Sequence, residues 1–177
     1  MPDIERYENL IIGDGSAGKN LAWALAKSGR RTAVIERKYL GGSCPNIACL
    51  PSKNVIQSAK VVSYFHRGGE FGITTGAWKV EMPAVRDRKR KMVDGLIASH
   101  LEKYRQNNAE LVMGEGRFVG PKTIEVAPTD GVTRTLRGEN VVISTGSRAR
   151  IDPIAGLAEA RPMTHIEALE LDRVPKP

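Results

Sequence analysis

The chain has 177 residues, of which 41% are hydrophobic and 27% charged, and its formal net charge is +7. This length is enough for one domain with an ordinary core, and the composition is typical of a soluble globular protein. The apolar run 21–26 is far shorter than the roughly 20 residues that cross a bilayer, and the charged N-terminus lacks the apolar core of a signal peptide. We therefore predict a soluble, cytoplasmic protein without a membrane partner.

The first 36 residues predict a single βαβ unit, with a strand at 7–12, a helix at 17–28 and a second strand at 32–36. Gly29 follows the helix as a C-terminal cap. One side of the helix is expected to face the core, and it carries Leu21, Ala24, Leu25 and Ser28.

The loop between this strand and helix has the pattern Gly13-x-Gly15-x-x-Gly18. In a dinucleotide-binding unit the first glycine allows a tight turn, the second lets a pyrophosphate approach the backbone, and the third lets the helix pack on the strand. Ser16 and Ala17 stand at the start of the helix, where N–H groups and the helix dipole favour phosphate. The pattern therefore predicts a dinucleotide site.

Glu36 ends the second strand, where an acid is expected to bind the ribose hydroxyls of a dinucleotide. A carboxylate there disfavours a 2′-phosphate, so the pattern suits FAD or NAD better than NADP. Asp14 lies inside the glycine loop, and its charge would repel a pyrophosphate unless its side chain points to solvent. The alternative interpretation is a glycine turn with only a structural role.

Cys44 and Cys49 are the only cysteines of the chain. On one regular helix their side chains would point about 140° apart and could not meet. A disulfide needs the two Cα atoms within about 7 Å and side chains that point toward each other. Cys44 is therefore expected on non-helical or distorted backbone. Cys49 near a helix start, with Lys53 one turn on, would have a stabilised thiolate. Such a close pair indicates thiol–disulfide chemistry, and two buried structural cysteines are the alternative.

No metal site is predicted, because none of the three histidines stands at ligand spacing from the cysteines. The remaining residues predict a helix from 49 to about 64, a loop at 66–76, a helix at 83–107, strands at 109–118, 123–127, 133–137 and 140–144, and an irregular tail. The apolar stripe of the longer helix consists of Val85, Met92, Val93, Leu96, Ile97, Leu101 and Tyr104.

Residues 86–91 carry five basic residues and one acidic residue, a local net charge of +4. No aromatic interleaving and no nucleic-acid-reading motif accompanies this run, so we predict a solvated helix face and no specific nucleic-acid partner. The run falls on the first turns of the predicted helix, where positive charge is unfavourable with the helix dipole.

Residues 41–53 read Gly-Gly-Ser-Cys-Pro-Asn-Ile-Ala-Cys-Leu-Pro-Ser-Lys. This segment resembles Gly-Gly-Thr-Cys-Val-Asn-Val-Gly-Cys-Val-Pro-Ser-Lys, the motif of the FAD-dependent pyridine nucleotide–disulfide oxidoreductases. That family includes dihydrolipoamide dehydrogenase, mercuric reductase and glutathione reductase. Residues 114–118 resemble the family segment that meets the adenine, and residues 142–147 resemble its Ala-Thr-Gly-Ser motif. The resemblance covers essentially the whole chain.

The resemblance implies an α/β fold, namely a Rossmann-like FAD-binding domain with a parallel sheet, flanking helices and a small β-meander. It also implies that Cys44 is the interchange thiol, Cys49 the thiol against the flavin and Lys53 a neighbour of flavin N5. The implied FAD-binding residues are Gly13, Gly15, Ser16, Ala17, Gly18, Glu36, Arg37, Gly42, Ser43, Cys49, Lys53, Glu115, Gly116, Ser144, Thr145 and Gly146.

The family's length implies that residues 1–170 are an incomplete N-terminal FAD-binding domain. Residues 171–177 would then begin a linker to an absent NAD(P)H-binding domain. The expected parent enzyme is a homodimer that passes electrons between NADH or NADPH, FAD and a Cys44–Cys49 disulfide, and then to a small disulfide or metal-ion substrate such as mercuric ion. The chain alone is expected to be inactive, and the alternative is an FAD-binding module with no turnover of its own.

Overall fold

The computed structural model describes residues 4–128 and 131–175, so the last two residues of the predicted linker lie outside the described part. The chain forms two compact units. The first unit consists of residues 1–46 and 96–147, and the second of residues 47–95 and 148–177. The prediction of one FAD-binding domain over residues 1–170, followed by a linker, stays a prediction.

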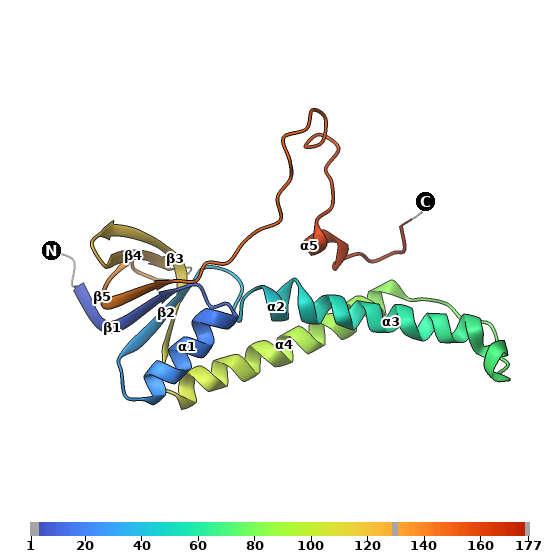
Figure 1. Ribbon diagram of the computed structural model, residues 1–177, viewed down its shortest axis with the longest axis horizontal. Coiled ribbons are helices and arrows are strands. Elements are labelled where there is room, and N and C mark those ends of the chain that lie inside the picture. The colour runs from blue at the N-terminus through green and yellow to red at the C-terminus, as the bar shows by residue number, and fades with distance from the viewer. Residues whose placement is uncertain (1–3, 129–130, 176–177) are drawn as a thin grey trace. The chain divides into compact units, whose positions relative to one another are not determined.

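The first unit contains a five-stranded sheet that closes into a barrel (Figure 1). Its strands are β1 (Ile4–Ile12), β2 (Thr32–Glu36), β3 (Glu110–Gly120), β4 (Thr123–Pro128) and β5 (Arg134–Ile143). β1 pairs in parallel with β2 and with β5, and β2 pairs in parallel with β3. β3, β4 and β5 form an antiparallel meander. The predicted parallel sheet with a small meander is therefore confirmed.

The two strands predicted at 133–137 and 140–144 are a single strand, β5. Its first half pairs with β4, and both halves pair with β1. Gly138 makes this continuity possible, because a Cβ there would lie 3.1 Å from Cγ of Leu10 and 2.7 Å from O of Asn140. The prediction of two separate strands was therefore wrong, because Gly138 lets one strand pass close to Leu10.

The strands bury side chains on both faces. One core cluster takes residues from all five strands: Tyr7, Leu10, Ala33, Ile35, Val112, Ile124, Val126 and Leu136. A second cluster joins the other face to the helices and consists of Ile11, Ala22, Trp23, Ala26, Val34, Tyr104 and Ala109. Because strand side chains alternate between faces, the neighbours Leu10 and Ile11 belong to different clusters.

Helix α1 (Ser16–Lys27) packs on β1 and β2 with a different face from the predicted one. Leu21 is 37% exposed, whereas the buried residues are Gly18, Lys19, Ala22, Trp23 and Ala26. The helix turns this face inward because Gly18 has to meet the strand, and the bulky Trp23 ring then packs edge-on against Tyr104. The predicted stripe was therefore wrong.

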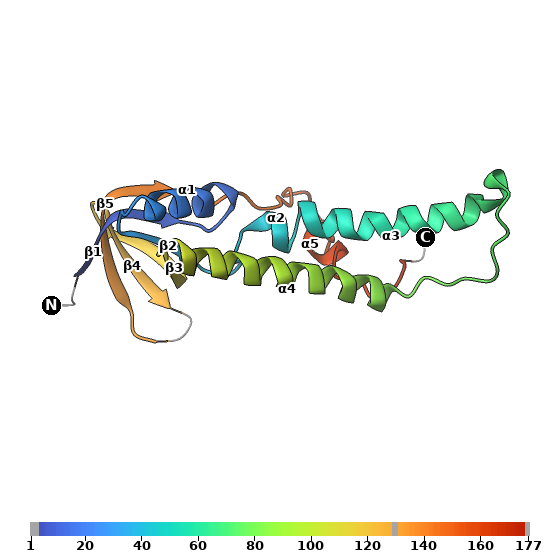
Figure 2. The same ribbon diagram turned by 90° about the horizontal axis from the view of Figure 1, so that it is seen from below.

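The second unit contains α3 (Cys49–Arg67), a 3-10 turn η1 (Gly68–Phe71), α5 (His165–Ala168) and the first part of α4 (Met82–Gln106). Figure 2 shows α3 and this part of α4 side by side, and Nη2 of Arg88 donates a hydrogen bond to Oγ of Ser58 at 2.8 Å across the pair. The predicted apolar stripe of α4 is half-buried or buried along its length and is confirmed. Within the described residues, no helix is both long enough and apolar enough to cross a membrane.

Two short elements lie where irregular chain was predicted. Residues 68–71 form η1, and α5 begins at Thr164, whose side chain accepts a hydrogen bond from N of Ile166. Glu167 closes a capping box with Thr164. The Thr-x-x-Glu pattern is a known helix-start signal, so α5 was readable from the sequence.

The basic run is not a solvated helix face throughout. Lys89 is 1% exposed, and its ammonium donates to O of Leu169 at 3.0 Å and forms an ion pair with Glu170. Arg90 binds the same carboxylate at 2.6 Å. Two basic residues near the start of α4, Lys89 and Arg90, therefore bind Glu170 and fix the segment that contains α5 within the second unit.

Candidate functional site

The glycine loop follows β1 and approaches the end of β5. Gly13 has a φ of 101°, and a Cβ at this position would lie 2.3 Å from O of Ser144. N of Ser144 donates to O of Ile12 at 2.7 Å, which fixes this approach. A Cβ at Gly18 would lie 2.0 Å from O of Gly13. Side chains are therefore excluded at these positions, as the glycine pattern predicted.

The segment before Cys44 lies on the same loop. Gly42 has a φ of 76°, and a Cβ there would lie 2.4 Å from Cα of Gly15. Three segments that the sequence assigned to one cofactor, namely 13–18, 42–43 and 144–146, thus meet through backbone rather than side chains. Exposed backbone at the N-terminus of a 12-residue helix is what a pyrophosphate needs, so these residues fit FAD.

The residues predicted for the adenosine half also lie together. Glu36 ends β2, and its carboxylate accepts hydrogen bonds from N of Asp14 at 2.9 Å and from N of Lys38 at 2.8 Å. Arg37 forms an exposed ion pair of 3.5 Å with Glu115 on the neighbouring strand β3. Carboxylate oxygens accept more than one bond each, so Glu36 keeps capacity for a ribose hydroxyl.

Asp14 does not point to solvent. Its side chain is fully buried, with Tyr104 donating to Oδ1 and N of Gly41 donating to Oδ2 at 2.6 Å. Burial raises the pKa of Asp14, while the bonds from Tyr104 and Gly41 act in the opposite direction. The sequence left the direction of this side chain open, because it does not show that α4 brings the Tyr104 phenol to this loop. Asp14 ties the glycine loop to the cysteine segment.

The cysteine segment is bent between its two thiols. Cys44 is half-buried on the short helix α2 (Ser43–Asn46), and Cys49 is half-buried at the start of α3. Ala48 between them has a φ of −134° and a ψ of −107°, so one regular helix does not hold both cysteines. The break between the cysteines agrees with the expectation, but the expected non-helical backbone at Cys44 was wrong, because Cys44 lies on a short helix of its own. Lys53 is exposed on α3.

Sequence reasoning missed a cluster of buried polar side chains behind this segment. Lys19 is 6% exposed, and its Nζ donates to O of Gly41 at 2.8 Å. His100 and Trp23 lie next to it, with ring centroids 5.6 Å apart, and a Cβ on Gly41 would touch the imidazole at 2.6 Å. No sequence motif marks a buried lysine, and only the predicted stripe of α4 pointed toward this region.

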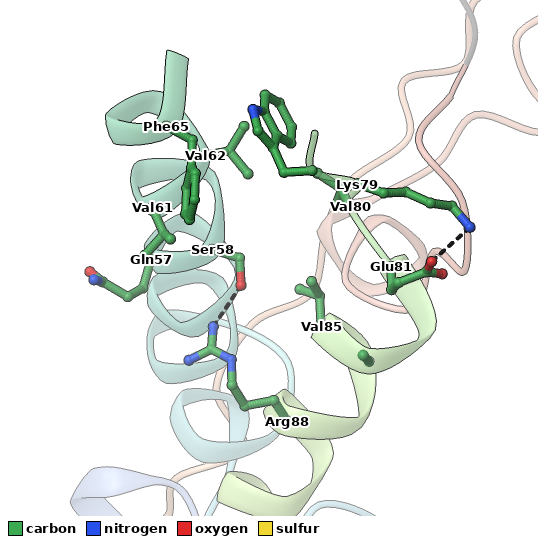
Figure 3. A pocket seen from close by; sticks show the side chains of 12 residues that line it. Gln57, Ser58, Val61, Val62, Phe65, Lys79, Val80, Glu81, Val85 and Arg88 are labelled. Atoms are coloured by element: carbon green, nitrogen blue, oxygen red, sulfur yellow. Dashed lines mark hydrogen bonds and ion pairs between the residues drawn. The ribbon is translucent and has the colours of Figure 1, made fainter. Parts of the chain in front are cut away.

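The second unit contains an apolar cavity of about 500 Å³ between α3 and the start of α4. Figure 3 shows Val61, Val62 and Phe65 of α3 facing Val85 of α4 across it. Arg88 closes one end by its bond to Ser58. None of the predicted site residues lines this cavity.

A parallel sheet with a glycine-rich βα turn, met by two further stretches of backbone, defines a Rossmann-like dinucleotide-binding domain. The family model "Pyridine nucleotide-disulphide oxidoreductase" matches residues 7–177, and the chain belongs to this family. The suspected resemblance is thereby confirmed.

Curated relatives include dihydrolipoyl dehydrogenases. The enzyme of Mycoplasma pneumoniae is 35% identical over 175 residues, which are 96% of this chain and 37% of that protein. The Bacillus subtilis enzyme is 32% identical over 178 residues, which are 96% of this chain and 38% of that protein. The chain thus spans well under half the length of these relatives.

Among solved structures, the Cu(II) complex of RclA, an HOCl-induced flavoprotein disulfide reductase from Escherichia coli, is similar with a TM-score of 0.77 at 27% identity. The Cu(II) complex of its C43S mutant gives a TM-score of 0.80 at 26% identity. Each match covers 97% of this chain and 36% of the other.

Proposed function

We propose that this chain is the FAD-binding part of a flavoprotein that passes electrons between NADH or NADPH, FAD and a Cys44–Cys49 disulfide. The observation that carries the proposal is the contact of Gly42 with Gly15, at which a Cβ would overlap the backbone. This contact joins the pyrophosphate loop to the segment that reaches Cys44 two residues later. The residues proposed to bind the cofactor and the residue proposed to react with the substrate thus belong to segments that pack against each other.

Different residues would hold different parts of FAD. Gly13, Gly15 and Gly42 leave backbone open toward the pyrophosphate, and Ser16 and Ala17 are exposed at the N-terminus of α1. The remaining residues assigned to the cofactor are Gly18, Glu36, Arg37, Ser43, Cys49, Lys53, Glu115, Gly116, Ser144, Thr145 and Gly146. When bound, FAD would supply the hydride chemistry that links NADH or NADPH to the cysteine pair.

The cysteines would supply the exchange step. The Cys44 thiolate attacks one sulfur of a disulfide R–S–S–R, and the mixed disulfide is then resolved by Cys49. The products are two thiols R–SH and the Cys44–Cys49 disulfide, so two electrons and two protons pass from the protein to the substrate. The half-buried position of both residues is compatible with access for a small disulfide.

A metal ion is the second candidate substrate, because RclA is described as a Cu(II) complex of a disulfide reductase. One dithiol would reduce two Cu(II) ions to Cu(I), releasing two protons and forming the Cys44–Cys49 disulfide. No group of three or more His, Cys, Asp or Glu residues suited to a resident metal occurs in the described residues, so the ion would act as substrate. The homodimer and the cytoplasmic location stay predictions.

The test is the visible spectrum of the purified 177-residue chain after addition and removal of excess FAD. We expect retained flavin absorbance and, after a dithiol is added, a new long-wavelength band from the Cys49 thiolate. Cys49→Ser should abolish this band, whereas Cys44→Ser should keep it. A colourless protein, or a band that survives Cys49→Ser, would contradict the proposal.

Steady-state oxidation of NADH and NADPH separates the enzyme from a bare FAD-binding module. We expect no turnover by the 177-residue chain itself. We expect disulfide-dependent turnover by the whole protein that contains it, which Cys44→Ser should abolish while flavin reduction remains. Whole protein that binds FAD but never reduces a disulfide would favour the module.

A further inference from the structure

Lys19 is an unusual residue for a helix packed on a sheet. Its residue exposure is 6%, and a lysine is almost never fully buried unless it is paired. The ammonium donates one hydrogen bond to O of Gly41 at 2.8 Å, a neutral acceptor. An ammonium has three N–H donors and a full positive charge, so this carbonyl alone does not balance it.

The charges around Lys19 come from the glycine loop, α2 and α4. Burial lowers the pKa of Lys19, while Asp14 and then Cys44 favour its charged form. Lys103 on α4 acts against it, and the neighbouring His100 has its own pKa lowered by burial and by these two lysines. A negative charge on Asp14 or on Cys44 would therefore favour the charged form of Lys19.

Asp14 is already engaged by other donors. Its two oxygens accept hydrogen bonds from Tyr104 and from N of Gly41. Gly41 thus bonds to Asp14 through its N–H and to Lys19 through its carbonyl. The loop is tied further by Asn46, whose Nδ2 donates to O of Leu40 and O of Gly42 at 2.8 Å each. Gly41, whose carbonyl holds the Lys19 ammonium, packs against the residue that follows Cys44, because a Cβ on Gly41 would lie 2.8 Å from Cγ of Pro45.

We propose that the buried ammonium of Lys19 stabilises the thiolate of Cys44 and so lowers the pH at which this cysteine becomes reactive. The electrostatic interaction of a pair is mutual, so a thiolate that favours the charged lysine is favoured by it equally. Screening by water is weak at a buried cation. Lys19 is a positioning residue that acts through Cys44, and its relevance to turnover rests on the proposed function.

The experiment measures alkylation of Cys44 by iodoacetamide as a function of pH. It uses the whole chain carrying Cys49→Ser, which leaves one cysteine of the two in the sequence. Lys19→Met keeps most of the length of the side chain and removes its charge. We expect the pH midpoint of the reaction to rise by roughly one unit, and the rate well below the midpoint to fall about tenfold. An unchanged midpoint in folded Lys19→Met would overturn the proposal.

Two further variants separate charge from packing. Lys27 is exposed at the end of the same helix, so Lys27→Met should leave the midpoint unchanged. Lys19→Arg keeps the positive charge, so its pH midpoint should stay close to that of the chain with Lys19. A midpoint that moves equally in Lys19→Met and Lys19→Arg would show a packing effect and reject the electrostatic role.

A reciprocal measurement does not depend on the stability of Lys19 variants. The titration of the Lys19 side chain is followed by NMR in the parent chain and in Cys44→Ser. We expect the pKa of Lys19 to fall when the thiolate is removed, and no change would contradict the proposal. Neither readout involves FAD or NAD(P)H, so failure of FAD binding would overturn the proposed function without altering this result.

Discussion

Gly42 has a backbone conformation and a close neighbour that are both unfavourable for any residue with a Cβ atom. Its φ of 76° is a left-handed conformation, and a Cβ would lie 2.4 Å from Cα of Gly15. We predict that Gly42→Ala lowers the free energy of unfolding by roughly 3 kcal/mol or more and abolishes retention of FAD. Urea unfolding and flavin fluorescence measure the two effects.

Gly29 is the matched control for Gly42. It also has a left-handed conformation, with a φ of 85°, but a Cβ there meets nothing within 4 Å. Gly29→Ala should therefore cost only about 1–2 kcal/mol and leave FAD binding intact. Equal losses in the two variants would show that backbone conformation, and not the close approach to Gly15, explains the result.

Tyr7 is a buried residue whose charge state should affect alkaline stability. Its hydroxyl donates to Oε2 of Glu110 at 2.6 Å, and burial followed by this bond raises its pKa to about 12. Because the pKa of Tyr7 is raised in the folded protein, the protonated hydroxyl contributes fully to the free energy of unfolding below pH 10, its ordinary pKa. This contribution is lost as the pH rises through 12.

We therefore predict that Tyr7→Phe costs about 1 kcal/mol of unfolding free energy at pH 8. The difference between the parent chain and the variant should shrink between pH 10 and 12. Urea unfolding of both proteins at several pH values tests this, and a difference that does not depend on pH would refute the assigned titration.

At the scale of elements, the basic run of α4 holds the segment that contains α5. The Lys89 side chain is 2% exposed and pairs with Glu170, whose side chain is 43% exposed. We predict that Glu170→Ala destabilises the second unit by about 2 kcal/mol, because it leaves a buried ammonium without its carboxylate. Hydrogen exchange of the amides at 82–95 reports the loss.

Arg90 supplies the comparison, since it binds the same carboxylate from a side chain that is 52% exposed. Arg90→Ala should cost less than about 1 kcal/mol, as exposed ion pairs usually do. If both substitutions had the same small effect, burial of Lys89 would not govern the stability of this contact.

At the scale of the whole molecule, the predicted FAD contacts divide unequally between the two units. Gly13, Glu36, Gly42 and Ser144 belong to the first unit, whereas Cys49 and Lys53 belong to the second. We predict that FAD at 100 times its Kd stabilises the first unit by about 2.7 kcal/mol. Hydrogen exchange with and without FAD should show the gain in the first unit, and equal protection of both units would contradict it.

The sequence alone was sufficient for the family, the βαβ unit and the meander. These features depend on local rules, since glycine, helix-start and alternation patterns act over a few neighbouring residues. The same rules indicated that one regular helix would not hold both cysteines, and the conformation of Ala48 agrees.

Three features depended on residues distant in sequence that only the folded chain brings together. Asp14 turns inward because Tyr104 reaches it from 90 residues away. Lys89 is buried because Glu170 meets it from 81 residues away. Lys19 faces Gly41 because Gly18 sets which side of α1 meets the sheet. The burial of a charge is decided by its partners, and a sequence pattern does not show which partners the fold will supply.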